Sequence, residues 1–523
     1  MIPDGTSASV LTLSRLYKSG IGYAEHQQIG NTSLHIDPYI CGLVKTHCSD
    51  APIGDSAPTG STFATGVVSQ AGYVAAYPEK TENDIASVDP QLANTPAMTI
   101  LEAAKLLGKS TGLAVTVEFP HATPADFSSH TSNRGDYKSI VSQMVKNHID
   151  VVFGGGINHL NDENKDYLQK NGWEVILGDY NRFNSFSGEK VWGLFAPSDL
   201  PYDLDRDKTT CPSLKEMTEK AISSLSKNEN GFFLMVEGSK VDWAAHDNDP
   251  IAIVTEFLAF DEAVKVAIDF AKKDGNTAVI ICPDHGNSGL SIGGPATSSG
   301  YSKIPKNNFI APLINSKTTL GRFAQIVSNK NNTETSLKQD LSDYFGINNL
   351  TSDELKMLLE AVKINPKSNR IEQNKVKNAV TKLFNSRTSL GFTTTGHTGE
   401  DVFLGVYHPT GDILSGVRHN VEVNEYMQQL FGIENLAAST KKYFCGHHTL
   451  FPADQYKCAI LKNDGTPILQ VTSNKTKKTV SLKAYDNVAL VNKKTSVPFQ
   501  TVFVYMGKRN EFFIPQEIKK LID

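Results

Sequence analysis

The chain has 523 residues, of which 39% are hydrophobic and 20% are charged, and this composition excludes a largely disordered protein. Its formal net charge of -5 excludes an extended basic surface of the kind that binds nucleic acid through phosphate contacts. The longest apolar runs, such as TAVIIC at 277–282, are too short to cross a bilayer as a helix, so we expect no transmembrane segment.

Short apolar runs alternate with amphipathic segments through the first 290 residues or so. The predicted strands are TGLAVTV (111–117), DVVFGGG (150–156), GFFLMV (231–236) and TAVIICPDHG (277–286). The predicted helices cover residues 97–109, 139–148, 213–227 and 251–273. Buried strands that alternate with helices predict an α/β fold, with a doubly wound, mostly parallel sheet and helices on both faces. Ligands of such sheets bind at the carboxyl ends of the strands.

The composition changes after residue 298. Residues 299–390 form polar, lysine-rich helical patterns with asparagine-rich joints, which predicts an inserted, mainly helical subdomain. Residues 420–433 look like a closing helix, and the pattern from there to residue 523 is typical of short strands. We therefore predict a catalytic domain of residues 1–298 and 391–435, an insertion at 299–390 and a β-rich C-terminal appendage at 436–523.

The six cysteines contain no CxxC pair. Cys41 with Cys48, and Cys445 with Cys458, are close enough in sequence for local disulfides, and unpaired buried thiols fit equally well.

Acidic, histidine and hydroxyl side chains follow the predicted strands. The members of this set are Glu237, Asp242 and His246 after the third strand, Asp284 and His285 after the fourth, His121, Thr123 and Arg134 after the first, and Asp4 and His397 elsewhere. Asp242 and His246 are four residues apart, so they share one face of a helical turn. Any one of these residues alone is more often a cap or a surface group than a ligand. Together, at one sheet edge, they indicate a metal site, because carboxylate and imidazole bind zinc and oxygen ligands suit magnesium.

The stretch IGDSAPTGSTFATG at 53–66 has two interpretations. It is either a loop that leads into a helix of small residues, or a turn that exposes Ser56 as a nucleophile. A serine hydroxyl is inert until a neighbouring group activates it, so the choice depends on the rest of the chain.

These motifs, in this order, make the chain resemble the alkaline phosphatase family, which comprises metal-dependent phosphomonoesterases with a serine nucleophile. The segments that carry the resemblance are PDG (3–5), GDSAPTG (54–60), HATPADFSSHTSNR (121–134), VEGSKVDWAAH (236–246), PDHG (283–286) and GHTGEDV (396–402). The resemblance covers the chain from its start to about residue 295, and again from about 390 to 433.

The resemblance implies hydrolysis of small-molecule phosphate monoesters through a phosphoserine, with two Zn²⁺ ions and one Mg²⁺ ion as cofactors. The implied ligands are Asp242, His246 and His397 for the first zinc, Asp4, Asp284 and His285 for the second, which also contacts Ser56, and Asp4, Thr123 and Glu237 for magnesium. Arg134 is implied to grip the phosphate and Asp55 to orient Arg134.

Some positions depart from the family pattern. His121 stands where some bacterial members have an aspartate near the magnesium, and an imidazole there weakens the prediction of that ion. Trp243 varies within the family and could pack beside the phosphate pocket, and Pro58 is unusual in the nucleophile motif. Only Met1–Pro3 precede Asp4, where family members have a strand and a secretory signal upstream. We therefore expect that residues have been removed, and that the protein is periplasmic, secreted or at the cell surface.

Other functions fit parts of the pattern. SAPTG at 56–60 resembles the start of a sulfatase motif, but Gly60 stands where that motif has an arginine. A phosphodiesterase or phosphomutase of the same superfamily is a second alternative, although a diesterase pocket would lack Arg134 and Glu237. An inactive relative that serves as a surface-binding module would not need every ligand. The insertion is expected to form a crown over the active site or a homodimer contact, as insertions in the family do.

Overall fold

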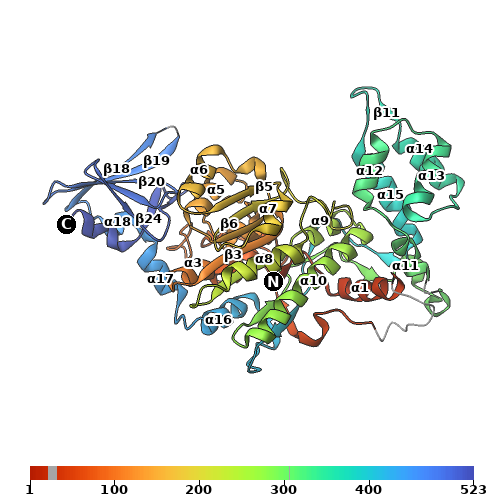
Figure 1. The fold of residues 1–523 in the computed structure, drawn as a ribbon, viewed down its shortest axis with the longest axis horizontal. Helices are drawn as coiled ribbons and strands as arrows, with labels where there is room; N and C mark the ends of the chain where they lie inside the picture. Colours follow the sequence, from red (N-terminus) through yellow and green to blue (C-terminus); the bar gives the residue numbers. More distant parts are fainter. Residues whose placement is uncertain (22–31, 306, 464) are drawn as a thin grey trace. The chain divides into compact units, whose positions relative to one another are not determined.

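The computed structural model describes residues 1–21, 32–305, 307–463 and 465–523 (Figure 1). The chain forms two compact units, which are described separately here. Unit 1 comprises Met1–Cys41, Pro201–Glu216 and Gly238–Ile413, and unit 2 comprises Gly42–Leu200, Met217–Glu237 and Leu414–Asp523.

Unit 2 is built on a parallel sheet. Five of its strands follow the order β7 (Phe232–Gly238), β3 (Ser110–Glu118), β4 (Val151–Gly155), β6 (Val191–Leu194) and β5 (Glu174–Leu177). β3 and β4 are buried along almost their whole length, which explains their continuous apolar sequences. The predicted α/β class with a mostly parallel sheet is confirmed. β5 and β6 were not predicted, because four residues each are too few to show a strand pattern.

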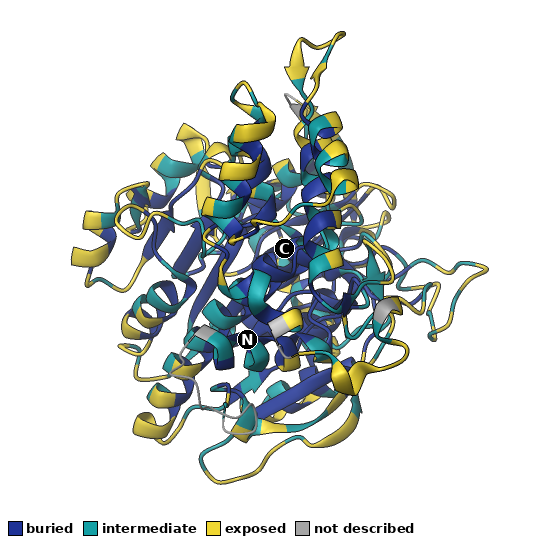
Figure 2. Cartoon of the chain, turned by 90° about the vertical axis from the view of Figure 1, so that its right-hand side faces the viewer, coloured by how far each residue is buried: buried dark blue, intermediate teal, exposed yellow. Residues whose placement is uncertain are grey.

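Helices accompany this sheet. They are α2 (Ser56–Thr65), α3 (Ile100–Leu106), α4 (Ala122–Asp126), α5 (Tyr137–Lys146), α6 (Asp162–Lys170), α7 (Tyr180–Ser185), α8 (Leu214–Leu225), α16 (Asn420–Leu430), α17 (Leu436–Tyr443) and α18 (His447–Leu450). α3 packs against β3, and α6 packs against β5. Trp192 and Phe153 on the strands are fully buried, and Figure 2 marks such core residues dark blue.

A second, antiparallel sheet occupies the C-terminal part of unit 2. Its strands run in sequence order as β18 (Tyr456–Asn463), β19 (Thr466–Ser473), β20 (Thr479–Lys483), β21 (Val488–Val491) and β22 (Thr495–Pro498). Smaller strands are β2 (Ile40–Lys45), β16 (Gly416–His419), β17 (Cys445–Gly446), β23 (Val504–Met506) and β24 (Glu511–Ile514). Alternate residues of β19 are buried, with Leu469 and Val471 in the core. The predicted β-rich addition is confirmed.

Unit 1 contains long helices and short strands, most of them in antiparallel pairs. The helices outside the insertion are α1 (Ala8–Ile21), α9 (Lys240–His246) and α10 (Pro250–Asp274). The strands are β1 (Ile2–Pro3), β8 (Val279–Ile281), β9 (Gly286–Asn287), β10 (Ser291–Ile292), β13 (Leu390–Gly391), β14 (His397–Thr398) and β15 (Val402–Tyr407). We expected residues 277–286 to form a strand of the parallel sheet, but β8 pairs antiparallel with β15. An apolar sequence indicates that a strand is buried, but it does not indicate whether the strand pairs in a parallel or an antiparallel direction.

The segment between β10 and β13 is mainly helical, as predicted. Its helices are α11 (Asn307–Ile314), α12 (Leu320–Ser328), α13 (Glu334–Phe345), α14 (Ser352–Ala361) and α15 (Gln373–Arg387), with a hairpin of β11 (Ile364–Asn365) and β12 (Arg370–Ile371) (Figure 1). Phe323, Phe345 and Phe384 form a buried aromatic cluster between three of these helices. The boundaries of the three regions predicted from sequence stay predictions.

Two sequence-based questions have direct answers within the described residues. All six cysteines are free thiols, so the two local disulfides do not form. No helix in the described ranges combines the length and apolar character needed to cross a membrane.

A buried polar network joins α3 to its neighbours in unit 2. Glu102 accepts hydrogen bonds from His130 Nε2 (3.1 Å), Asn147 Nδ2 (3.2 Å) and the backbone N–H of Thr99 (3.1 Å). The side chains of Glu102 and His130 are completely inaccessible to solvent.

Glu102→Ala should lower the free energy of unfolding by about 3 kcal/mol, because it leaves a buried imidazole without its carboxylate acceptor and removes one of the two acceptors of a buried amide. Urea unfolding followed by circular dichroism measures this loss. Glu425→Ala, on the exposed side of α16, is the control and should change the free energy by less than about 0.5 kcal/mol. Equal effects of the two substitutions would contradict the assignment.

Candidate active site

Unit 1 brings the six predicted zinc ligands together from separate parts of its sequence. Asp4 directly follows β1, Asp242 and His246 lie on α9, Asp284 and His285 lie between β8 and β9, and His397 begins β14. The antiparallel pairing of β14 with β9 places His397 opposite Asn287, two residues after His285.

Asp242, His246 and His397 form one group. His246 Nε2 lies 3.1 Å from His397 Nε2 and 3.3 Å from Asp242 Oδ2. His397 Nε2 lies 3.6 Å from Asp242 Oδ1. The other ring nitrogen of His246, Nδ1, donates to the carbonyl of Thr395 at 2.7 Å, so Nε2 is the nitrogen that faces the group and would bind a metal ion in place of its proton.

Asp4, Asp284 and His285 form a second group, and all three are fully buried. His285 Nε2 lies 3.4 Å from Asp4 Oδ1 and 3.5 Å from Asp284 Oδ2. The rings of His285 and His397 have their centroids 4.0 Å apart, so the two groups adjoin. Two sets of possible ligand atoms each lie within 4.8 Å of one another: those of Asp242, His285 and His397, and those of Asp4, Asp284 and His285.

The electrostatics of these groups favour a cation. Burial alone would raise the pKa of Asp242, but the hydrogen bond from His246 and the charges of His285 and His397 hold it far below its usual range. The hydrogen bond to Asp242 raises the pKa of His246 to about 9. Asp284 Oδ2 is buried and has no hydrogen-bond partner among the described residues. Carboxylate oxygens and imidazole nitrogens at these spacings fit Zn²⁺.

The position of Gly5 explains why the PDG motif has a glycine after Asp4. Its φ of +59° is unfavourable for other residues, and a Cβ atom there would lie 2.2 Å from Asp242 Oδ1. The backbone N–H of Gly5 also donates to Asp284 Oδ1 at 3.1 Å. Only glycine lets the chain after Asp4 approach both carboxylates this closely.

Ser56 lies in unit 2, at the first residue of α2. Asp55 is the N-cap of this helix, and its Oδ1 accepts from the backbone N–H of Ser56 at 2.9 Å. Pro58 occupies the third helical position, before the first intrahelical bond from Thr59 N–H to the Asp55 carbonyl. The missing N–H of Pro58 therefore removes no helical hydrogen bond, which accounts for a proline in this motif.

Arg134 is held beside the start of α2. Its Nη1 donates to Asp55 Oδ1 at 2.6 Å, and its Nη2 lies 3.4 Å from His121 Nε2. The side chains of Arg134 and Asp55 keep 30% and 28% of their accessible surface. Arg134 is thus oriented by a carboxylate and remains partly open to a ligand.

Thr123 and Glu237 lie at the carboxyl ends of adjacent parallel strands of unit 2. Val115 of β3 is in register with Glu237 of β7, and Thr123 lies in α4, which follows β3. Both side chains are fully buried, and Thr123 Oγ1 has no hydrogen-bond partner within the described ranges. Oxygen atoms of this kind fit Mg²⁺.

Trp243 is placed on α9, in unit 1, one residue after Asp242 and only partly buried. The ammonium group of Lys240 lies 5.5 Å from the centroid of its ring and 4.0 Å from that of Tyr202. Trp243 therefore packs against a neighbouring cation in its own unit.

Sequence reasoning missed two groups that support the metal ligands. Asn287 Nδ2 donates to Asp242 Oδ1 at 2.7 Å, and the carbonyl of Thr395 accepts from His246. The position of Asn287 directly after the PDHG motif was an available signal. The carbonyl of Thr395 gave no sequence signal, because every residue type has a backbone carbonyl.

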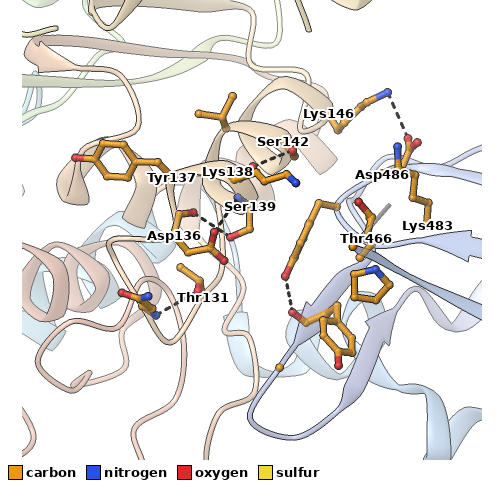
Figure 3. Close-up of a pocket in the computed structure, with 18 of the residues that line it drawn as sticks. Thr131, Asp136, Tyr137, Lys138, Ser139, Ser142, Lys146, Thr466, Lys483 and Asp486 are labelled. Carbon is orange, nitrogen blue, oxygen red and sulfur yellow. Dashed lines mark hydrogen bonds and ion pairs between the residues drawn. The ribbon is translucent and has the colours of Figure 1, made fainter. Parts of the chain in front are cut away.

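A separate pocket of about 1230 Å³ lies in unit 2 (Figure 3). Its walls come from α5 with the preceding loop, from residues 158–164 around the start of α6, from the C-terminal antiparallel sheet and from residues 505–508. Five lysines face three carboxylates around it, and Lys146 pairs with Asp486 at 3.5 Å. The lysines outnumber the carboxylates by two, and neither Ser56 nor any predicted metal ligand lines the pocket.

Curated proteins of known family resemble this chain over most of its length. The family model for alkaline phosphatase matches residues 1–433. Alkaline phosphatase 3 of Bacillus subtilis (strain 168) is 36% identical over 398 residues, which are 74% of this chain and 79% of that protein. Alkaline phosphatase 4 of the same organism is 33% identical over 432 residues, which are 81% of this chain and 86% of that protein.

A solved structure agrees with these sequence matches. The cold-active alkaline phosphatase from a psychrophilic Shewanella species has a TM-score of 0.71 and 28% identity, and the match covers 82% of this chain and 98% of that one. The family model ends before the C-terminal antiparallel sheet, so that sheet lies outside the matched region. The family model and the relatives together lead to one conclusion: the chain belongs to the alkaline phosphatase family.

Proposed function

We propose that this chain, a phosphoric monoester hydrolase by its family, works through a phosphoserine formed on Ser56 and releases inorganic phosphate. The observation that carries the proposal is the convergence of six nitrogen- and oxygen-bearing ligands from four parts of unit 1. Buried carboxylates need a cation or a hydrogen-bond partner, and Asp284 Oδ2 has no such partner among the described residues.

Two displacements at phosphorus make up the reaction. Ser56 loses its proton to solvent and its Oγ bonds to phosphorus, while the bond from phosphorus to the leaving oxygen breaks and that oxygen takes up a proton from water. Water then attacks the phosphoserine, and the bond from phosphorus to Oγ breaks, which returns the serine and yields inorganic phosphate. The first position of α2 favours this chemistry, because the helix N-terminus stabilises negative charge that develops nearby.

The proposed metal ligands follow the groups described above. Asp242, His246 and His397 would hold one zinc ion, Asp4, Asp284 and His285 a second that also contacts Ser56, and Asp4, Thr123 and Glu237 a magnesium ion. When bound, these ions supply Lewis-acid stabilisation of the attacking and leaving oxygens. The buried Oγ1 of Thr123 and the buried Glu237 support the magnesium assignment.

Arg134 would bind two oxygens of the phosphate through its planar fork, and the ion pair with Asp55 would keep that fork in position. His121, which lies beside Arg134, and Trp243 are proposed as further substrate contacts.

We also propose a cellular location and an oligomeric state for this protein from the pattern of its family. We expect a periplasmic, secreted or cell-surface enzyme and a homodimer. Light scattering of the purified protein measures the second property directly, and a monomer would contradict it.

Ser56→Ala should lower kcat by at least about a thousandfold, because no group replaces the nucleophile. Acid quenching during turnover of a radiolabelled phosphate monoester should leave label on Ser56 of the wild type and none on the variant. Ser49→Ala, which removes another buried serine hydroxyl, is the control and should retain activity. Undiminished turnover of Ser56→Ala would contradict the phosphoserine mechanism and would favour the alternative superfamily activities.

Arg134→Lys should raise KM about tenfold and weaken inhibition by inorganic phosphate by a similar factor. Lysine keeps the charge but loses the planar pair of donors. Steady-state kinetics with phosphate as a competitive inhibitor measure both quantities. Arg182→Lys, at an exposed ion pair with Glu174, should leave both unchanged.

The purified protein should contain two zinc ions per chain, and His397→Ala should reduce this number to one, since His397 belongs to one of the two groups. Elemental analysis gives the metal content. Chelation should abolish activity, and zinc should restore it. His408→Ala, also in unit 1, should retain both ions because His408 hydrogen-bonds locally to Thr410 and belongs to neither group of proposed ligands. Full zinc content in His397→Ala would contradict the ligand assignment.

A further inference from the structure

The turn between α9 and α10 is held by the inserted helices. This turn, residues 247–249, directly follows His246 at the end of α9. Lys377 Nζ of α15 lies 2.6 Å from Asp247 Oδ1. Asn385 Nδ2, two turns further along α15, donates to the carbonyl of Asn248 at 3.0 Å. The insertion therefore contacts the turn with two side chains of one helix.

A third contact involves Asp249 and the start of α12. Asp249 Oδ1 caps α10 by accepting from the backbone N–H of Ala252 at 3.1 Å, and its Oδ2 accepts from the N–H of Leu320 at 2.8 Å. One buried carboxylate thus binds the N-termini of two helices, one of them in the insertion. Each of the three residues of the turn is bonded to the insertion.

The turn has an unusual backbone conformation, which is closed locally by hydrogen bonds from Asn248 N–H to the Ala245 carbonyl (2.9 Å) and from Asp249 N–H to the Ala244 carbonyl (3.0 Å) and is then held from outside. Asn248 has a φ of +49°, in the left-handed region that residues other than glycine seldom adopt, although asparagine does so more often than most. A conformation of this kind persists where surrounding contacts fix it. The bonds from Lys377, Asn385 and Leu320 supply such contacts at the residue itself and on both sides.

The inserted helices are packed against one another and bonded to another part of unit 1. α12 and α15 pack together, with Phe323 and Phe384 buried. Asp205, from another segment of unit 1, accepts from Thr318 Oγ1 (2.6 Å) and Thr319 Oγ1 (2.6 Å) just before α12. The helices that hold the turn are therefore anchored independently of it.

We propose that Lys377 and Asn385 are positioning residues for His246: through the 247–249 turn, the inserted helices fix the imidazole against Asp242 and His397. The inference rests on the proposed zinc sites and names what keeps one of them assembled. The second group is held differently, since the contacts to Asp284 and His285 come from Gly5, Asp4 and Gly286.

This difference predicts an unequal effect on the two ions. Release of the turn lets His246 move away from its partners, whereas Asp4, Asp284 and His285 keep their own supports. Substitution of groups that orient metal ligands lowers affinity about 10- to 100-fold. Lys377 and Asn385 contact the turn that follows His246 and do not touch the imidazole itself. We therefore expect a loss of zinc affinity at the lower end of that range.

The experiment measures zinc release from the loaded, full-length enzyme into an excess of a chromogenic chelator. Lys377→Ala should release one zinc ion per chain about tenfold faster than the wild type and the other at the wild-type rate. The fast ion should be the one that is absent from His397→Ala. Excess zinc in the assay should restore the activity of Lys377→Ala, which a general folding defect would not allow.

Matched variants complete the test. Lys377→Arg keeps the ion pair with Asp247 and should release both ions at wild-type rates. Lys382→Ala removes an exposed lysine from the same helix and should also match the wild type. Asn385→Ala, which breaks a different bond to the same turn, should reproduce the selective effect of Lys377→Ala.

Unchanged release from both Lys377→Ala and Asn385→Ala would overturn the inference. So would equal acceleration of both ions with a lower melting temperature, because that result indicates loss of the fold. A wild-type enzyme that holds no zinc would instead contradict the proposed function itself.

Discussion

The short antiparallel pairing of β9 with β14 is the contact on which the candidate metal site depends. It joins Gly286 to Thr398 and Asn287 to His397, across an excursion of more than a hundred residues. The pairing brings the rings of His285 and His397 to a centroid distance of 4.0 Å. Without it, the first group would lack one imidazole, and the buried carboxylate of Asp242 would lose one of the positive charges that stabilise it. The pairing is therefore as important to the chemistry as the ligands themselves.

Burial of the charged groups of this site costs free energy on folding. Hydrogen bonds from neighbouring residues offset part of that cost. Buried carboxylates lose hydration, and the hydrogen bonds from Gly5 and Asn287 recover only part of that loss. The raised pKa of His246, about 9, shows that the negative potential of the group already favours a positive charge there. A divalent cation would satisfy the same potential more completely than protons do, and it would in turn stabilise the folded unit that binds it.

Much of this organisation could be predicted from the sequence, and the failures have physical causes. The buried runs of β3, β4 and β7 and the long amphipathic α10 were predicted because their patterns extend over several residues. β5 and β6 were too short, and the antiparallel direction of β8 leaves no trace in an apolar sequence. The candidate ligands could be named through the family motifs, whereas backbone groups such as the carbonyl of Thr395 have no residue type to reveal them. Pro58, unexplained in the sequence, is accounted for by its place in the first turn of α2.

The pairing of β10 with β13 has a consequence for how this fold can vary. Ser291 lies opposite Gly391, so the intervening chain leaves and returns at neighbouring points. The chain entropy lost on closing such a loop grows only with the logarithm of its length, and a doubling costs about 0.6 kcal/mol. Helices can therefore be gained or lost between these two strands over evolutionary time at little thermodynamic penalty. What must survive such changes is the small set of bonds that reaches back from the excursion to the turn after His246.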